Sequence, residues 1–220
     1  MKIEVFSDPV CPWCFIGKKR LEAAMALRPN NPVSLRWRAF QLNPDMTENG
    51  MDRRSYLNAK FGGEDRARAV YQRIADVGQS VGIDFRFDLI RTTPNTIQAH
   101  RLIGFAQRPE HACADAVIQG LFEAYFLQGH NIGETAVLQD IAVAAGIDAV
   151  IAAAYLADDE DREDIVSEDI FARRLGINGV PCFIIDGKFT LSGAQEPESF
   201  LPLFDLSAEE QRHAPESASL

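Results

Sequence analysis

The stretch SDPVCPWCFIGKKR, residues 7–20, decides the fold, because it places two cysteines two residues apart where a strand passes into a helix. KIEVF, residues 2–6, precedes it and mixes β-branched with aromatic residues, which is typical of a short buried strand. After the cysteines, apolar residues recur at helical spacing, and the helix is expected to stop before Pro29. Cys11 and Cys14 are therefore predicted to lie at the first turn of a helix that directly follows a strand.

A second strand follows this helix. VSLRWRAF, residues 33–40, alternates between apolar residues and polar ones, which predicts a half-buried strand. Strand, helix and strand in this order form a βαβ unit, whose strands are parallel and whose crossover is right-handed.

From residue 46 onward the pattern is helical, with short connections that contain Gly or Pro. A further helix is expected within residues 161–175, because acidic residues suit its start, two arginines suit its end and Gly176 supplies a left-handed stop. The acidic run DDEDRED, residues 158–164, is interpreted as a solvated helix start. The helices expected in the block before it cover residues 52–61, 64–81, 95–107, 113–127, 134–145 and 149–157.

The C-terminal part predicts a hairpin and one last helix. CFIID and KFTLS flank Asp186-Gly187, a strong hairpin signal, and a helix is expected near residues 196–206. The whole order predicts an α/β protein with a thioredoxin fold (βαβ–α–ββα) and an α-helical insertion between the second strand and the following core helix. The expected divisions are residues 1–45 and 160–206 for the thioredoxin-like parts, 46–159 for the helical insertion and 207–220 for a disordered tail.

The charge and hydropathy of the chain indicate which partners are disfavoured and in which compartment the protein is expected. The formal net charge is −10 and the pI is about 4.9, so phosphate-rich nucleic acids and anionic membrane surfaces are disfavoured as partners. Glu4 and Asp8 interrupt the stretch where a signal peptide needs continuous apolar residues, and the longest apolar run is too short to span a bilayer. We therefore expect a cytoplasmic protein, in a compartment that keeps most disulfides reduced.

Three roles are open to the cysteine pair. A structural disulfide across so small a loop removes little chain entropy and is unusual in the cytosol. A zinc site needs four ligands, and no second pair of cysteines or histidines has ligand spacing, so no metal is expected. A redox pair fits the position best. Unpaired N–H groups and the helix dipole stabilise a thiolate at Cys11, Pro12 suits the first turn, and Cys14 is one turn on, placed to attack a mixed disulfide.

A second motif supports the redox interpretation. INGVPCF, residues 177–183, puts Val180-Pro181 just before the first strand of the hairpin. Proline is normally excluded there unless its bond is cis or its missing donor is useful. In thioredoxin-like proteins a cis-proline at this topological position faces the cysteine pair and leaves the backbone of the preceding residue free to pair with an extended substrate. The predicted fold therefore implies a cis Val180-Pro181 bond, and a trans-proline that begins an edge strand is the alternative.

The sequence resembles the DsbA-like thioredoxin family, specifically its FrnE branch. The stretches that carry this resemblance are FSDPVCPWCFIGKKRLE, FQLNP, TPNTIQAHRL, GINGVPCFIIDGK and LSGAQ. The resemblance covers nearly the whole chain except the tail. It implies thiol–disulfide oxidoreductase activity on protein or peptide thiols and disulfides, with no cofactor except glutathione as a candidate co-substrate. The relatives include glutathione-dependent 2-hydroxychromene-2-carboxylate isomerases and kappa-class glutathione transferases, which typically carry serine where this chain has Cys11.

Four residues carry more specific expectations. Glu4 lies where such proteins often keep a buried acid that accepts the proton of the second cysteine; a solvated carboxylate is the alternative. Trp13, between the cysteines, is expected to be partly exposed and to contact substrate, unless it packs against the insertion. Cys182 follows the predicted cis-proline, where relatives often have an aromatic or aliphatic residue; we expect it to point inward and to be a slow packing residue. Cys11 is expected to be the exposed, fast-reacting thiol.

Three functions remain open at this point. A disulfide oxidoreductase is favoured because both cysteines are present. A glutathione-dependent isomerase or transferase would turn over an electrophile without net thiol exchange. A non-catalytic interaction module would keep its function when both cysteines are replaced.

Overall fold

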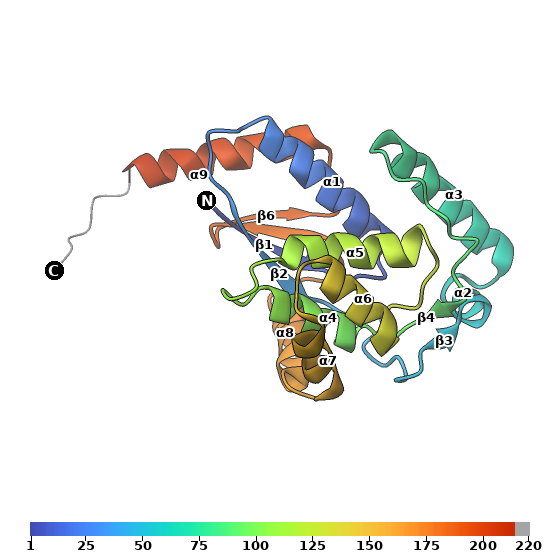
Figure 1. Ribbon diagram of the computed structural model, residues 1–220. Helices are drawn as coiled ribbons and strands as arrows, with labels where there is room; N and C mark the ends of the chain where they lie inside the picture. The colour runs from blue at the N-terminus through green and yellow to red at the C-terminus, as the bar shows by residue number, and fades with distance from the viewer. Residues whose placement is uncertain (214–220) are drawn as a thin grey trace.

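The central sheet has the strand order β2–β1–β5–β6 in the computed structural model, which describes residues 1–213 (Figure 1). β1 runs parallel to β2 and antiparallel to β5, and β5 pairs with β6 in a hairpin. The predicted turn is present, because both Asp186 and Gly187 have the positive φ that a tight hairpin turn requires. This topology confirms the predicted thioredoxin fold. The strands are β1 (Lys2–Ser7), β2 (Ser34–Ala39), β5 (Cys182–Ile185) and β6 (Phe189–Ser192).

The two faces of the sheet are covered by different helices. Figure 1 shows α1 (Pro12–Ala26) and α9 (Leu201–His213) on one side and α8 (Arg162–Arg174) on the other. Successive side chains of β1 point to opposite faces of the sheet. Val5 packs in the hydrophobic cluster that contains α1, and Phe6 packs in the cluster that contains α8.

The helical insertion lies between β2 and α8, as predicted. Its aromatic core is continuous with α1: the Phe15 ring stacks on the Phe122 ring at 5.0 Å. The proposed division at residues 46–159 stays a prediction, because the two parts share one hydrophobic cluster. The short β3–β4 pair was not expected. The elements of the insertion are β3 (Met51–Asp52), α2 (Arg53–Phe61), α3 (Glu64–Ser80), β4 (Thr92–Thr93), α4 (Ile97–Ala106), α5 (Ala114–Phe126), α6 (Thr135–Ala144) and α7 (Ala149–Ala157).

The predicted disordered tail is wrong for residues 207–213, which are helical. After a 3-10 turn, η1 (Pro197–Ser199), α9 continues to His213 and buries Ser207. Its last turns are fixed by polar contacts that an apolar pattern does not reveal: the Ser207 hydroxyl and the Gln211 amide both donate to the Asp186 carboxylate. Residues 214–220 of the predicted tail lie outside the described residues.

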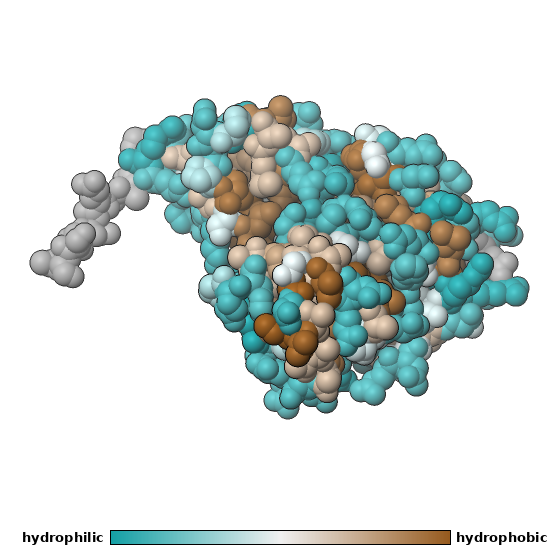
Figure 2. All heavy atoms as spheres, in the orientation of Figure 1, coloured by the Kyte–Doolittle hydropathy of each residue, from teal (hydrophilic) through white to brown (hydrophobic). Residues whose placement is uncertain are grey.

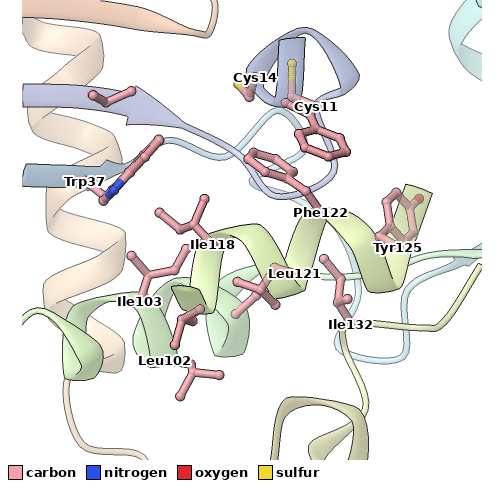
Figure 3. Close-up of a cluster of buried hydrophobic side chains, with 14 of the residues drawn as sticks. Cys11, Cys14, Trp37, Leu102, Ile103, Ile118, Leu121, Phe122, Tyr125 and Ile132 are labelled. Atoms are coloured by element: carbon pink, nitrogen blue, oxygen red, sulfur yellow. The ribbon is translucent and has the colours of Figure 1, made fainter. Parts of the chain in front are cut away.

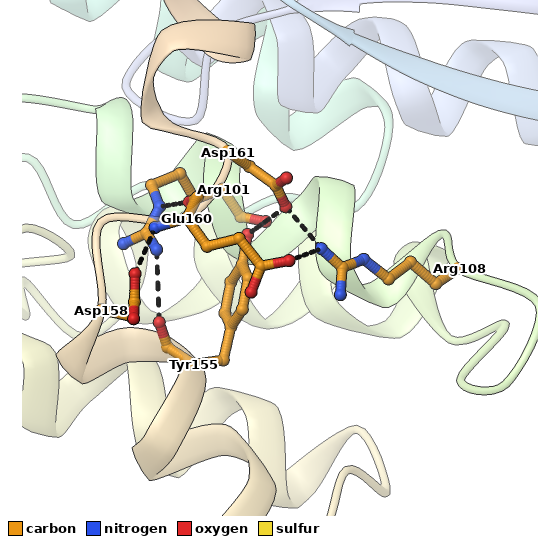
Figure 4. A network of polar contacts seen from close by, with 6 residues as sticks. All are labelled: Arg101, Arg108, Tyr155, Asp158, Glu160 and Asp161. Atoms are coloured by element: carbon orange, nitrogen blue, oxygen red, sulfur yellow. Dashed lines mark hydrogen bonds and ion pairs between the residues drawn. The ribbon is translucent and has the colours of Figure 1, made fainter.

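The acidic run at residues 158–164 is mostly exposed and leads into α8, as predicted, and it also anchors the end of the insertion (Figure 4). Arg108 on the α4–α5 connection donates to the Glu160 carboxylate at 2.9 Å and to the Asp161 carboxylate at 2.7 Å. Arg101, which is fully buried, donates to the backbone carbonyl of Glu160 at 2.5 Å. These contacts fix the position at which α8 begins.

Candidate redox site at the start of helix α1

The two cysteines lie at the start of α1, as the sequence predicted. Cys11 is the N-cap residue with an extended backbone, and Pro12 occupies the first helical turn. The turn is closed by backbone hydrogen bonds from Cys11 N to the Asp8 carbonyl at 2.9 Å and from Cys14 N to the Cys11 carbonyl at 3.0 Å. No side chain caps this helix end, so its free N–H groups are available to a sulfur anion at Cys11.

The expectation that Cys11 is exposed is wrong. Its exposed fraction is 3%, and that of Cys14 is 1%. Both are free thiols, and Figure 3 shows them at the beginning of α1, next to the aromatic side chains of the core. Trp13 is the accessible residue of the motif at 37% exposed, in line with the expected partial exposure. Access to the sulfurs was not readable from sequence because it depends on what packs over the turn.

Cys14 is held by polar groups from the end of β1. Burial and a hydrogen bond with the Cys11 thiol raise the pKa of Cys14 well above its ordinary value. The Ser7 hydroxyl and the Asp8 backbone N–H both bond its sulfur and act in the opposite direction. The proton of Cys14 therefore needs an acceptor before this thiol can attack a mixed disulfide.

The Val180-Pro181 segment faces Cys11. The Val180–Pro181 peptide bond is cis, and the Cys11 thiol donates to the Val180 carbonyl at 3.6 Å. Gly17 of α1 allows the close approach, because a Cβ at this position would lie 2.7 Å from the Pro181 ring. The structure thus brings together Cys11, Cys14 and the two residues expected to contact an extended substrate.

Glu4 does not join this group. Its side chain is 23% exposed and lies 3.7 Å from the Arg38 guanidinium and 3.7 Å from the Lys2 ammonium. Its carboxylate is therefore engaged with two cations, and within residues 1–213 it makes no hydrogen bond with either cysteine of the pair. The proposed role of Glu4 stays a prediction, and the structure offers a stronger candidate.

That candidate is Asp8, which the sequence analysis treated only as a break in an apolar stretch. The residue is fully buried, and its carboxylate accepts backbone N–H bonds from Val10 at 3.3 Å and Leu42 at 2.7 Å. Burial outweighs these bonds and raises the pKa of Asp8 from 3.8 to about 6. A carboxyl that titrates near neutral pH beside the cysteine turn can accept and return a proton.

His100 of α4 lies against Asp8. Its Nε2 is 3.9 Å from the Asp8 carboxylate and has no hydrogen-bond partner among the described residues, while the ring bonds the Phe40 backbone carbonyl. Burial lowers the pKa of His100 from 6.5 to about 4, so the imidazole is neutral at pH 7. The pairing of Asp8 with His100 depends on how α4 packs near the end of β1. A single sequence does not contain this information.

Cys182 points inward, as expected, but toward the other face of the sheet. It is 2% exposed and packs with Phe6, Phe40 and Ala172 on the α8 side, whereas Cys11 and Cys14 belong to the cluster on the α1 side. Burial raises the pKa of Cys182, and the Ser192 side chain bonds its sulfur. The sequence analysis did not foresee that hydrogen bond. Both observations favour a packing role.

Comparisons with known proteins agree with this fold. The model of the DSBA-like thioredoxin domain matches residues 2–204. The chain belongs to this family. A probable DsbA oxidoreductase, SCO1869 of Streptomyces coelicolor, is 28% identical with a TM-score of 0.84 and covers 100% of this chain and 92% of its own.

Two further relatives extend the comparison. The uncharacterized protein YwbO of Bacillus subtilis is 26% identical over 90% of this chain and 92% of its own. The cytosolic disulfide reductase DsbM of Pseudomonas aeruginosa has the same fold, with 20% identity, a TM-score of 0.64 and coverage of 99% and 100%; it has also been solved with GSH. Membership in the FrnE branch stays a prediction.

Proposed function

We propose that this protein is a thiol–disulfide oxidoreductase that uses Cys11 and Cys14 on protein or small disulfides. The observation that carries the proposal is the geometry of the pair: two free thiols one helical turn apart, one at an uncapped helix N-terminus and the other bonded to it. Membership in the DSBA-like family supports an enzyme of this class.

In the proposed reaction, the Cys11 thiolate attacks one sulfur of a substrate disulfide. The Cys11–substrate bond forms, the substrate S–S bond breaks, and the leaving thiolate takes a proton. Cys14 then loses its proton and attacks Cys11, which releases the second substrate thiol and leaves a Cys11–Cys14 disulfide. The substrate is reduced by two electrons and the pair is oxidised; the reverse sequence oxidises a dithiol.

Asp8 is proposed as the acceptor of the Cys14 proton. The support is its position, because the Asp8 backbone contacts both cysteines and its buried carboxyl has a pKa of about 6. Trp13 and the Val180-Pro181 backbone are proposed to contact the substrate, since the former is the exposed residue of the motif and the latter already faces Cys11.

Glutathione is proposed as the thiol that returns the pair to its reduced form, in the cytoplasm. The structural relative DsbM is a cytosolic disulfide reductase that has been solved with GSH, which supports this assignment. Within residues 1–213, no helix is both long and apolar enough to cross a membrane.

Insulin reduction in a glutathione buffer tests the proposal. The wild-type chain should accelerate precipitation of the insulin B chain, and the Cys11→Ser/Cys14→Ser variant should match the uncatalysed rate. A parallel assay with glutathione and 1-chloro-2,4-dinitrobenzene tests the alternative chemistry. Activity that survives the double substitution, or turnover of the electrophile without disulfide exchange, would overturn the proposal.

A further inference from the structure

A pocket on the insertion, away from the sheet, has the lining of an anion-binding site. It lies between α2, α3 and the segment at residues 85–91, and its volume is about 590 Å³. Pockets of about 300–1,000 Å³ accommodate small organic ligands. We call it the α2–α3 pocket, and we propose that it binds a small organic anion with one acidic head group on a flat apolar body.

The floor of the pocket contains a buried cation without a carboxylate partner. Arg53 is 8% exposed, and its guanidinium donates to the hydroxyls of Thr93 at 3.0 Å and Tyr71 at 2.8 Å, with Tyr125 at 3.5 Å. No ion pair joins it to a described carboxylate. A buried guanidinium held by neutral hydroxyls retains an uncompensated positive charge, and that charge attracts an anion.

The other charged residues of the pocket lining also carry more positive than negative charge. Arg54, Arg68 and Arg91 also line the pocket, against two aspartates. Asp52 accepts the Ser55 backbone N–H at 2.9 Å as the cap of α2, and the Asp88 carboxylate is bound by the Arg86 guanidinium at 2.9 and 3.0 Å. The lining thus contains four arginines and two aspartates, in a chain whose net charge is −10, and the Arg68 guanidinium also lies 3.8 Å from the Asp65 carboxylate. Because the guanidinium of Arg53 has only hydroxyl partners for its hydrogen bonds among the described residues, the lining keeps a positive field that favours an anionic ligand.

The remaining wall is aromatic. The Phe85 and Phe87 rings stack at 4.7 Å, and the Tyr71 ring meets Phe87 edge to face at 4.6 Å. Figure 2 shows hydrophobic surface along α3 with hydrophilic residues on either side of it. A flat apolar body can pack on these rings while its acidic group reaches the arginines. The inference does not depend on the dithiol, since no cysteine lines this pocket.

Two fluorescent probes of nearly the same shape test the proposal. 8-Anilinonaphthalene-1-sulfonate carries an acidic group on a flat apolar body, and N-phenyl-1-naphthylamine lacks only the sulfonate. Both are titrated into the full chain and into the Arg68→Gln/Arg91→Gln variant. Arg36→Gln/Arg174→Gln is the matched control, because it removes the same charge from exposed arginines outside the pocket. Phe87→Ala tests the apolar wall, and circular dichroism checks that each variant is folded.

We expect saturable one-to-one binding of the sulfonate, with a Kd that rises about tenfold in the pocket variant and stays unchanged in the control. The neutral probe should bind both variants alike, and Phe87→Ala should weaken both probes. Equal loss in the two arginine variants, equal wild-type affinity for the two probes, or no saturable binding would overturn the proposal. The Cys11→Ser/Cys14→Ser variant should bind the sulfonate normally, which separates this result from any failure of the redox function.

Discussion

Two carboxylates, Glu4 within β1 and Asp8 directly after it, lie in different environments. Glu4 is partly exposed between two cations, each 3.7 Å away, whereas Asp8 is fully buried and held by backbone N–H groups. Burial makes a carboxylic acid bind its proton more tightly, and it raises the pKa of Asp8 to about 6. The difference shows that burial and hydrogen-bond partners, which the sequence does not display, distinguish the two carboxyls as candidate proton acceptors.

The largest expected effect comes from the thiols at the Asp8 end of the strand. Cys14→Ser should abolish turnover, because a hydroxyl cannot resolve a mixed disulfide, and the substrate should accumulate on Cys11. Mass spectrometry of the variant after mixing with a disulfide peptide measures the adduct. Turnover at the wild-type rate would show that Cys14 is not the resolving thiol.

The next effect concerns the pH dependence of stability, in which Asp8 and His100 oppose each other. The raised pKa of Asp8, about 6 in place of 3.8, gives stability that is present below pH 4 and lost as the pH rises through 6. The lowered pKa of His100, about 4 in place of 6.5, gives stability that is present above pH 6.5 and lost as the pH falls through 4. Each contribution amounts to about 3 kcal/mol.

Single substitutions should separate the two contributions. The wild type loses stability as Asp8 ionises between pH 4 and 6.5, and the Asp8→Asn variant does not. The free energy of unfolding of Asp8→Asn, relative to that of the wild type, should therefore rise over this range. That of His100→Gln should fall over the same range. Urea denaturation at several pH values measures both, and Glu4→Gln is the control. Parallel curves for all the variants would mean that neither buried group titrates in this window.

A smaller effect distinguishes the two carboxylates in catalysis. Asp8→Asn should slow disulfide exchange about tenfold at pH 7 by removing the acceptor of the Cys14 proton. The wild-type rate should decline as the pH falls through about 6, and this decline should be absent in the variant. Glu4→Gln should stay within about twofold of wild type. A larger loss with Glu4→Gln than with Asp8→Asn would restore the role that the sequence suggested for Glu4.

The smallest effect is expected on the far face of the sheet. Cys182→Val removes a buried thiol of similar volume, at the cost of the hydrogen bond to Ser192. Exchange activity should stay within about twofold of wild type, and stability should fall by about 1 kcal/mol. Alkylation rates provide a second check, because Cys182, whose pKa is raised, should react more slowly than Cys11 at the uncapped start of α1.

Sequence patterns predicted the parts of the molecule that local rules determine. The strand before Cys11, the helix after it and the hairpin at Asp186-Gly187 follow from residue periodicity and turn chemistry. The parts that were missed depend on distant contacts: the extension of α9 relies on Asp186, and the burial of Asp8 relies on Leu42 and α4. No pattern within a few residues of these positions reports such contacts.

The most direct test of the account is the identity of the disulfide that forms. The protein is equilibrated in glutathione buffers of increasing oxidised fraction, quenched with acid, alkylated and mapped by mass spectrometry. The account predicts one reversible disulfide, Cys11 to Cys14, with Cys113 and Cys182 free throughout. A disulfide between Cys182 and either member of the pair at comparable potential, or a pair that stays reduced in every buffer, would contradict it.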